Sequence, residues 1–237
     1  MGFIRFPISA PISDHAEYFT KVAPYALNED MTGTIFTIGH STHPIDRFVE
    51  MLKAHDVTAL ADVRSSPFSR FNPQFNKNNL KEALIPFGIR YVFLGAELGA
   101  RSTDSNCYVD GKVRFDLLAK TDSFQRGVRR LAEGCRKYRI ALMCAEKDPI
   151  DCHRTILVSR NLKEAGFAVR HILENGQLES QDAIEKRLIS MFKMDNGDLF
   201  LSMEEIKDTA YRKQGELIAY AEQNEPNKMS EYEKARA

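Results

Sequence analysis

Short apolar runs rich in β-branched residues alternate with helical patterns through the middle of this chain. The runs that predict strands cover residues 34–38, 57–63, 90–94, 139–144 and 167–172. The patterns that predict helices begin at Pro44 and cover residues 76–87, 122–138 and 151–165. Strands that alternate with helices form parallel sheets, because right-handed crossovers return the chain to the same edge. The sequence therefore predicts a doubly wound, mainly parallel α/β sheet of about five strands, with helices on both faces.

This alternation divides the chain into three parts. Residues 33–176 form the predicted α/β domain, residues 1–32 an N-terminal extension, and residues 177–237 a helical, acidic C-terminal extension. A chain of 237 residues is long enough for one sizeable domain and too short for two of ordinary size. We therefore expect one main core.

Composition and charge narrow the class of protein. Hydrophobic residues make up 43% and charged residues 28%, a balance that excludes wholesale disorder and a disulfide miniprotein. No apolar run is long enough to span a membrane and no signal-peptide pattern starts the chain, so we expect a cytoplasmic protein without a membrane partner. We expect free thiols at the four cysteines, which are Cys107, Cys135, Cys144 and Cys152.

The formal net charge is zero, but it is unevenly distributed. Residues 122–173 carry eleven basic and six acidic side chains, whereas the chain from residue 174 onward carries nine basic and fourteen acidic ones. The centre of the chain is therefore expected to attract anions. The alternative is that the basic residues of the predicted helix 122–138 form an ordinary solvated face.

Polar clusters follow four of the predicted strands. Because the carboxyl ends of parallel strands meet at one edge of a sheet, we expect these clusters to converge on one site. Candidate anion-binding residues are the three arginines Arg64, Arg70 and Arg154, with short hydroxyl donors from Ser41, Ser65 and Ser69. Phe71 and Phe75 could stack a base beside Arg70 and Lys77, or could belong to the core.

The cluster after the fourth strand carries the most reactive side chains. Asp151 is a candidate helix N-cap, which would place Cys152, His153 and Arg154 in a first helical turn that favours anions and thiolates. Cys144 ends the strand like the nucleophile of cysteine phosphatases, but those enzymes have Cys-x5-Arg and Arg154 lies ten residues on. The alternative for both cysteines is burial as structural thiols.

The remaining candidates are acids, bases and metal ligands. His40 and His153 are candidate general acid/base residues, and Asp62 or Glu146 could orient them or accept protons. Asp62 and Arg64 could instead form a structural ion pair. Successive helical residues point about 100° apart, so Cys152 and His153 are not expected to reach one ion. A magnesium ion shared by Asp62 and Glu146 is a minor alternative, and we assign neither a metal nor a cofactor.

The motifs together resemble a known family. They are Thr37-Ile-Gly-His-Ser41, Asp62-Val-Arg-Ser65 with Pro67 and Ser69-Arg70, Leu98-Gly99, and Cys144-Ala-Glu146 with Cys152-His-Arg154. In this order they are similar to the largely bacterial family called domain of unknown function 488. The resemblance implies a stand-alone α/β domain without an established reaction.

These observations support three hypotheses about function. The first is an enzyme, a hydrolase or transferase, that acts on a phosphate-bearing substrate such as a nucleotide or nucleic acid, with Cys144 or Cys152 as nucleophile. The second is a non-catalytic module that binds nucleic acid or another partner. The third is a thiol redox or sulfur-handling protein that uses both cysteines. The sequence leaves the oligomeric state open.

Overall fold

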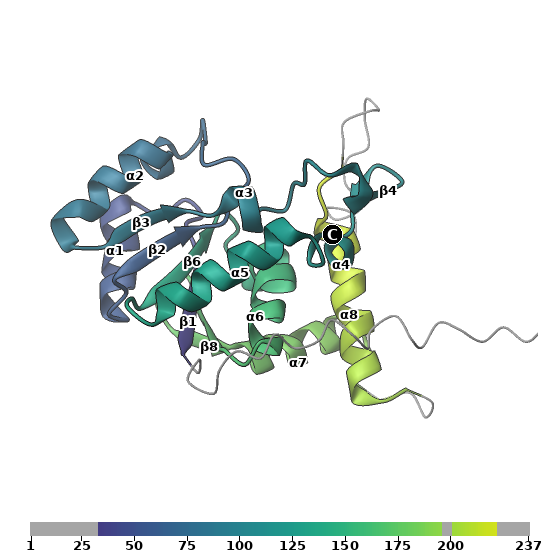
Figure 1. Cartoon of the computed structure of the whole chain (residues 1–237). Coiled ribbons are helices and arrows are strands. Elements are labelled where there is room, and N and C mark those ends of the chain that lie inside the picture. Colours follow the sequence, from purple (N-terminus) through teal and green to yellow (C-terminus); the bar gives the residue numbers. More distant parts are fainter. Residues whose placement is uncertain (1–32, 196–200, 222–237) are drawn as a thin grey trace, which may run out of the picture.

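The computed structural model describes residues 33–195 and 201–221, and the N-terminal extension predicted at residues 1–32 lies outside them. Eight strands are found in this part of the chain (Figure 1). They are β1 (Thr34–Gly39), β2 (Ala59–Asp62), β3 (Arg90–Phe93), β4 (Tyr108–Val109), β5 (Lys112–Val113), β6 (Ile140–Cys144), β7 (Ala168–Ile172) and β8 (Leu178–Ser180). Six of them form one sheet in the order β3-β2-β6-β1-β7-β8.

The sheet is parallel except for its last strand, β8, which runs antiparallel to β7. The three central strands β2, β6 and β1 are almost wholly buried. Burial on both faces explains why these strands appear in the sequence as continuous apolar runs rather than as alternating patterns. The predicted mainly parallel α/β sheet is confirmed.

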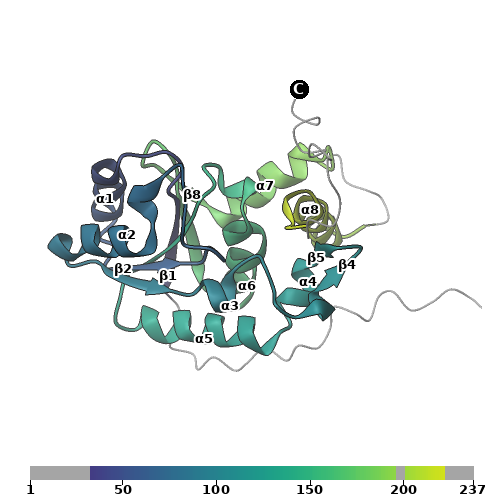
Figure 2. The same cartoon turned by 90° about the horizontal axis from the view of Figure 1, so that it is seen from above.

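Some helices cover the sheet, and others lie beyond it at one side. They are α1 (Ile45–Ala54), α2 (Lys77–Leu84), α3 (Gly95–Leu98), α4 (Phe115–Leu118), α5 (Asp122–Cys135), α6 (Arg160–Glu164), α7 (Gln181–Met191) and α8 (Met203–Ile218). Single 3₁₀ turns cover Pro73–Phe75, Ile85–Phe87, Ser105–Cys107 and Pro149–Asp151, and a π-helical segment covers Arg154–Ser159. Figure 2 shows α1 and α2 on one side of β1 and β2, with α5 on the other.

Two apolar clusters account for this arrangement. Successive strand residues point to opposite faces, so Phe36 and Ile38 of β1 pack in the cluster that includes residues of α1 and α2. Ile35 of the same strand belongs to the cluster that includes Phe124 and Leu131 of α5. The helices are held to the sheet by the burial of these apolar side chains.

Two segments differ from the prediction. The C-terminal extension, predicted as helical from residue 177, begins with the short strand β8, and α7 starts only at Gln181, where the Ser180 hydroxyl caps it. Residues 95–121, for which the sequence predicts neither a strand nor a helix, contain α3, β4, β5 and α4. These elements have two to four residues each, too few to show a hydrophobic period.

The C-terminal extension packs onto the domain through α7 and α8. A third apolar cluster joins Ile184 and Leu188 of α7 to Ile206 and Ala210 of α8. Beyond α8, the Tyr220 carbonyl accepts a hydrogen bond from the Val113 N–H of β5 at 3.0 Å. Among residues 33–195 and 201–221, none of the helices has both the length and the apolar character required to cross a membrane.

A buried polar network ties the extension to the sheet. The His171 ring of β7 accepts from the Thr37 hydroxyl at Nδ1 (2.8 Å) and donates from Nε2 to the Gln181 side-chain oxygen (2.7 Å). Burial lowers the pKa of His171 to about 3, so the ring is neutral and can use one nitrogen in each role. The Gln181 amide donates to the Tyr211 hydroxyl (2.7 Å), which donates to Glu185 (3.1 Å).

The substitution Tyr211→Phe tests this network. It keeps the ring but leaves buried groups of Gln181 and Glu185 without their partner, so we expect the free energy of unfolding to fall by about 1–3 kcal/mol. Chemical denaturation measures the loss. Tyr138→Phe, which alters a half-buried ring outside this network, is the control, and equal stability of the two variants would contradict the role assigned to the network.

Candidate functional site

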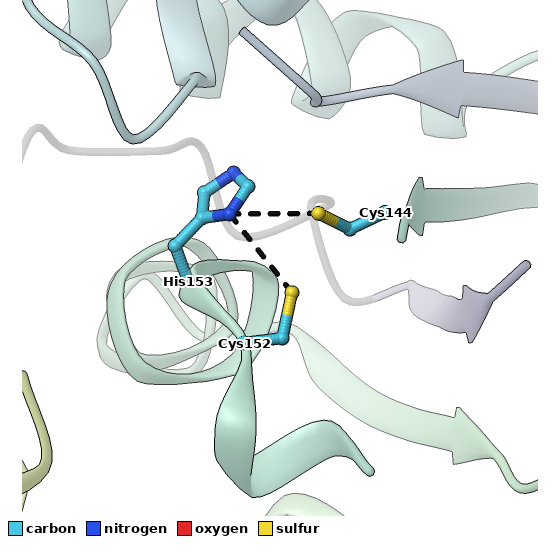
Figure 3. A group of neighbouring side chains, drawn as sticks. All are labelled: Cys144, Cys152 and His153. Atoms are coloured by element: carbon cyan, nitrogen blue, oxygen red, sulfur yellow. Dashed lines mark hydrogen bonds between the residues drawn. The ribbon is translucent and has the colours of Figure 1, made fainter. Parts of the chain in front are cut away.

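Two cysteines and one histidine meet beyond the carboxyl end of β6 (Figure 3). The Nδ1 atom of His153 lies 3.6 Å from Cys144 Sγ and 3.9 Å from Cys152 Sγ. The other ring nitrogen, Nε2, lies 3.0 Å from the Val63 carbonyl oxygen. Because a carbonyl only accepts, Nε2 carries the proton in the neutral ring. The lone pair of Nδ1 therefore faces the two sulfur atoms.

The backbone around Cys152 explains how neighbouring side chains reach one point. Asp148, not Asp151, caps the turn Pro149–Asp151, since its Oδ1 accepts from the Ile150 N–H at 3.0 Å. Cys152 then has an extended backbone (φ −132°, ψ 138°), and the helix starts after it. The predicted first helical turn at Asp151 is therefore wrong, and the divergence of about 100° expected for Cys152 and His153 does not apply.

This arrangement also has the shape of a metal site. Cys144 Sγ, Cys152 Sγ and a His153 ring nitrogen all lie within 4.8 Å of one another. Thiolate and imidazole are the ligands that zinc prefers, and the hydrogen bond from His153 to Val63 would orient the ring as it does in many metal sites. The same contacts suit a pair of reactive thiols.

The two thiols differ in acidity. The hydrogen bond that Cys144 donates to Cys152, followed by burial, raises the pKa of Cys144. Burial alone would also raise the pKa of Cys152, but the Cys144 hydrogen bond and the positive charge of Arg154 together lower it well below its ordinary value. Cys152 is therefore the thiolate of the pair and Cys144 the thiol.

Arg154 places a positive charge beside the sulfur atoms. Its side chain is fully buried, and its guanidinium donates from Nη1 to the Glu146 carbonyl (2.7 Å) and from Nη2 to the Lys147 carbonyl (3.4 Å). Its Nε has no partner among the described residues, and its backbone N–H lies 3.5 Å from Cys152 Sγ. This loop turns carbonyl oxygens inward, whereas a phosphate-binding loop turns N–H groups inward.

Gly39, the last residue of β1, allows this loop to close. A Cβ atom on Gly39 would lie 1.9 Å from the Glu146 carbonyl oxygen and 3.2 Å from Arg154 Nη2. Any other residue would push the loop outward. Two backbone hydrogen bonds hold the loop here, from the His40 N–H to the Cys144 carbonyl (2.8 Å) and from the Ser41 N–H to the Ala145 carbonyl (2.9 Å).

Arg64 is committed to a buried ion pair with Asp62. Its Nε and Nη2 donate to the two carboxylate oxygens at 2.9 and 2.7 Å. Nη2 also donates to the Phe75 carbonyl at 2.7 Å, and Nη1 to His40 Nε2 at 3.1 Å. Tyr91 donates its hydroxyl to Asp62 at 2.7 Å. This geometry fits a structural ion pair of Asp62 and Arg64. Both carboxylate oxygens of Asp62 are used, so neither is free for a shared magnesium ion.

His40 is also fully engaged. It is buried and stacks on Phe75, with 4.4 Å between the ring centroids. Its Nδ1 donates to the carbonyl of the next residue, Ser41, at 2.9 Å. Burial lowers its pKa to about 4. Of the two aromatic rings considered for base stacking, Phe75 is a core residue, fully buried beneath this ring.

The other predicted residues lie toward the surface. Ser65 and Ser69 accept backbone hydrogen bonds from Arg101 and Asn72, both at 3.0 Å. Arg70 is exposed on the loop after β2. Glu146 is exposed at the edge of a groove of about 800 Å³. The other residues that line this groove are Lys147, Asp148, Pro149, Asp151, Leu173, Glu174, Asn175, Arg187, Leu217 and Ile218.

The predicted residues therefore form two neighbouring groups, joined through the backbone contact of His40 with Cys144. One contains Cys144, Cys152, His153 and Arg154, and the other contains His40, Asp62 and Arg64. The sequence did not reveal the parts played by Val63, which contributes a backbone carbonyl, or by Tyr91 and Gly39. The strand end at Gly39 was the one available signal for a close approach of backbones.

Comparison with known families identifies the domain. The family described as "Domain of unknown function DUF488" matches residues 44–161. The chain belongs to the DUF488 family. The matched region of this DUF488 protein contains both cysteines, His153 and Arg154, whereas His40 precedes it. Searches of curated proteins and of solved structures found no significant match.

The buried His40 predicts a pH dependence of stability. The unfolded chain binds a proton at His40 below a pH of about 6.5, but the folded protein does so only near pH 4. Stability linked to His40 is therefore present above pH 6.5 and is lost as the pH falls toward 4. Between pH 7 and pH 4.5 we expect a loss of about 2 kcal/mol from this residue, on the scale of 1.36 kcal/mol per pKa unit.

Chemical denaturation of the wild type and of His40→Gln at both pH values isolates this contribution. The loss on acidification should be smaller in the variant, because glutamine does not titrate. His171 remains in both proteins and cancels in the comparison. An equal loss in the two proteins would show that His40 is not held neutral.

Proposed function

We propose that this DUF488 protein is a thiol–disulfide oxidoreductase that uses Cys152 and Cys144. The observation that carries the proposal is the contact of both sulfur atoms with one nitrogen of His153, at 3.6 and 3.9 Å. The geometry favours this function over the phosphate-directed enzyme expected from the sequence. Arg64 and Arg154 are buried and direct their guanidinium donors to protein atoms. Neither therefore presents a free pair of N–H donors that could bind a phosphate.

The location supports the proposal. We interpret the sheet as doubly wound, because the chain leaves β1 for α1, whose apolar residues lie in one cluster, and leaves β6 for the helix at Arg154, whose apolar residues lie in the other. Adjacent strands with connections to opposite faces form the switch point at which open α/β sheets bind ligands. β1 and β6 are adjacent, and Cys144 ends β6 at this point.

The first step is an attack by Cys152. Its thiolate attacks one sulfur of a small disulfide, forms a new S–S bond and expels the other half as a thiolate. The hydrogen bond from Cys144 and the positive charge of Arg154 favour the anionic form of Cys152 before the attack. The product is a mixed disulfide between Cys152 and half of the substrate. One S–S bond has formed and one has broken, so this step needs no other oxidant or reductant.

The second step uses Cys144. His153 Nδ1 accepts the Cys144 proton, and the resulting thiolate attacks Cys152 Sγ and expels the second half of the substrate. His153 returns its proton to this leaving thiolate, and the first thiolate takes a proton from water. The protein dithiol loses two electrons to form the Cys144–Cys152 disulfide, and the substrate disulfide gains them to form two thiols.

Access to the site requires a movement of the loop. Cys152 and Cys144 are only 1% and 4% exposed. Residues 145–151 separate them in sequence and carry exposed Glu146 and Lys147. We propose that this loop moves aside to admit a small substrate. The two sulfur atoms, within 4.8 Å of each other, then need a modest approach to reach the bonded distance of about 2.05 Å.

Oxidation by a small disulfide tests the proposal. The reduced full chain is incubated with hydroxyethyl disulfide and analysed by mass spectrometry. We expect a product lighter by two hydrogen atoms in which peptides containing Cys144 and Cys152 are linked. Cys144→Ser should stop at a mixed disulfide on Cys152, whereas Cys152→Ser should react far more slowly, because burial raises the pKa of the Cys144 thiol that remains of the pair.

Cys107→Ser and Cys135→Ser are the matched controls, since both alter free thiols outside the cluster. They should behave like the wild type. Reaction at Cys107 or Cys135 in place of the pair would contradict the proposal. Purified protein with one tightly bound zinc ion per chain, lost in Cys144→Ser, would assign the three side chains to metal binding instead.

A further inference from the structure

The segment between β2 and α2 presents two aromatic rings to solvent. Phe68 is 66% and Phe71 is 84% exposed. Figure 1 shows this segment projecting beyond the sheet beside the start of α2. A phenyl ring that is this exposed adds nothing to the core and costs solubility, so two in one segment indicate a surface built for contact. We call the residues Phe68, Arg70, Phe71, Lys77 and Lys81 the aromatic loop surface.

Hydrogen bonds hold the segment in this conformation. The Ser69 N–H donates to the Asn76 side chain at 2.7 Å, and the Ser69 hydroxyl accepts from the Asn72 N–H at 3.0 Å. The Lys77 N–H donates to the Pro67 carbonyl at 3.0 Å. Phe75, fully buried, anchors the base of the segment. Phe68 and Phe71 are therefore displayed on a braced loop, which reduces the conformational entropy lost on binding.

The charges of the surface have one sign. The sequence between Asp62 and Glu82 contains no acidic residue, whereas it contains Arg64, Arg70, Lys77 and Lys81. Arg64 is neutralised by Asp62. The other three are exposed. The neighbouring loop adds the exposed Arg101, whose backbone N–H is bonded to Ser65.

Cations and rings are arranged side by side. The Arg70 guanidinium lies 5.5 Å from the centre of the Phe71 ring, and Lys77 Nζ lies 5.1 Å from the centre of the Phe93 ring. Exposed rings can stack on bases of any sequence, and adjacent cations can contact the phosphates between them. Asn72 of the same segment is half-buried, and its side chain can donate to base edges.

We infer that the aromatic loop surface binds single-stranded nucleic acid. A duplex hides the faces of its bases, so the exposed rings fit an unpaired strand. The uniform positive charge complements the phosphates. This inference concerns a surface separate from the thiol pair and does not rest on the proposed oxidoreductase activity.

Fluorescence anisotropy with the full chain tests the inference. The probes are fluorescein-labelled oligothymidylate and oligouridylate of about 20 nucleotides, with a labelled duplex for comparison. We expect the single strands to bind more tightly than the duplex. With three exposed cations on phosphates, the logarithm of the affinity should fall with the logarithm of salt concentration with a slope of about −2. Phe68→Ala/Phe71→Ala should weaken binding by about 10-fold or more.

Phe87→Ala is the matched control. Phe87 is 46% exposed with Lys53 5.0 Å from its ring centre, but it lies at the turn before β3, at the opposite edge of the sheet from the carboxyl ends. This variant should bind like the wild type. Because all three rings are exposed, the variants should fold and should retain disulfide exchange.

Two results would overturn the inference. One is the absence of single-strand binding by the wild type at low salt, and the other is unchanged affinity in Phe68→Ala/Phe71→Ala. Binding by Cys152→Ser should equal that of the wild type. Absence of disulfide exchange in the wild type, with intact nucleic-acid binding, would therefore count against the oxidoreductase alone, and exchange without nucleic-acid binding would count against this surface alone.

Discussion

The structure of the site depends on the burial of one positive charge. The Arg154 guanidinium is fully enclosed, and the described residues offer it backbone carbonyl oxygens and the nearby Cys152 sulfur rather than a carboxylate ion pair. An isolated buried cation is costly, so its surroundings must supply negative potential. The inward carbonyls of the loop after β6 supply part of it. The Cys152 sulfur, whose pKa Arg154 helps to lower, supplies a further part, which links the folding of the loop to the acidity of a cysteine.

The neighbouring histidines show how local contacts divide roles between similar side chains. His40 is buried against Phe75 and has both ring nitrogens occupied, so it serves the framework. His153 is fixed by the Val63 carbonyl and turns its free nitrogen toward two sulfur atoms. The Asp62–Arg64 pair joins these halves through His40. A framework of this kind holds the cysteines in place while the loop between them remains partly exposed.

The sequence predicted the central strands and their helices because each is a long apolar run or a clear helical period. It also predicted that the residues after these strands would meet, since that follows from parallel topology. It could not show that Arg64 donates its hydrogen bonds to Asp62 and His40, because contacts between loops depend on packing. The sequence did not predict the extended backbone of Cys152, because Asp151 is a residue type that favours an N-cap and the cap is instead Asp148. The strand β8 was hidden by its short length.

The most direct test of this account is the acidity of the two thiols in the folded protein, followed by the ultraviolet absorbance of thiolates as the pH is raised. Arg154 is predicted to give one thiolate step well below the ordinary thiol pKa of about 8.5, present in Cys144→Ser and absent in Cys152→Ser. If every cysteine titrates at or above that ordinary value, the buried charge does not activate Cys152 and the account is wrong.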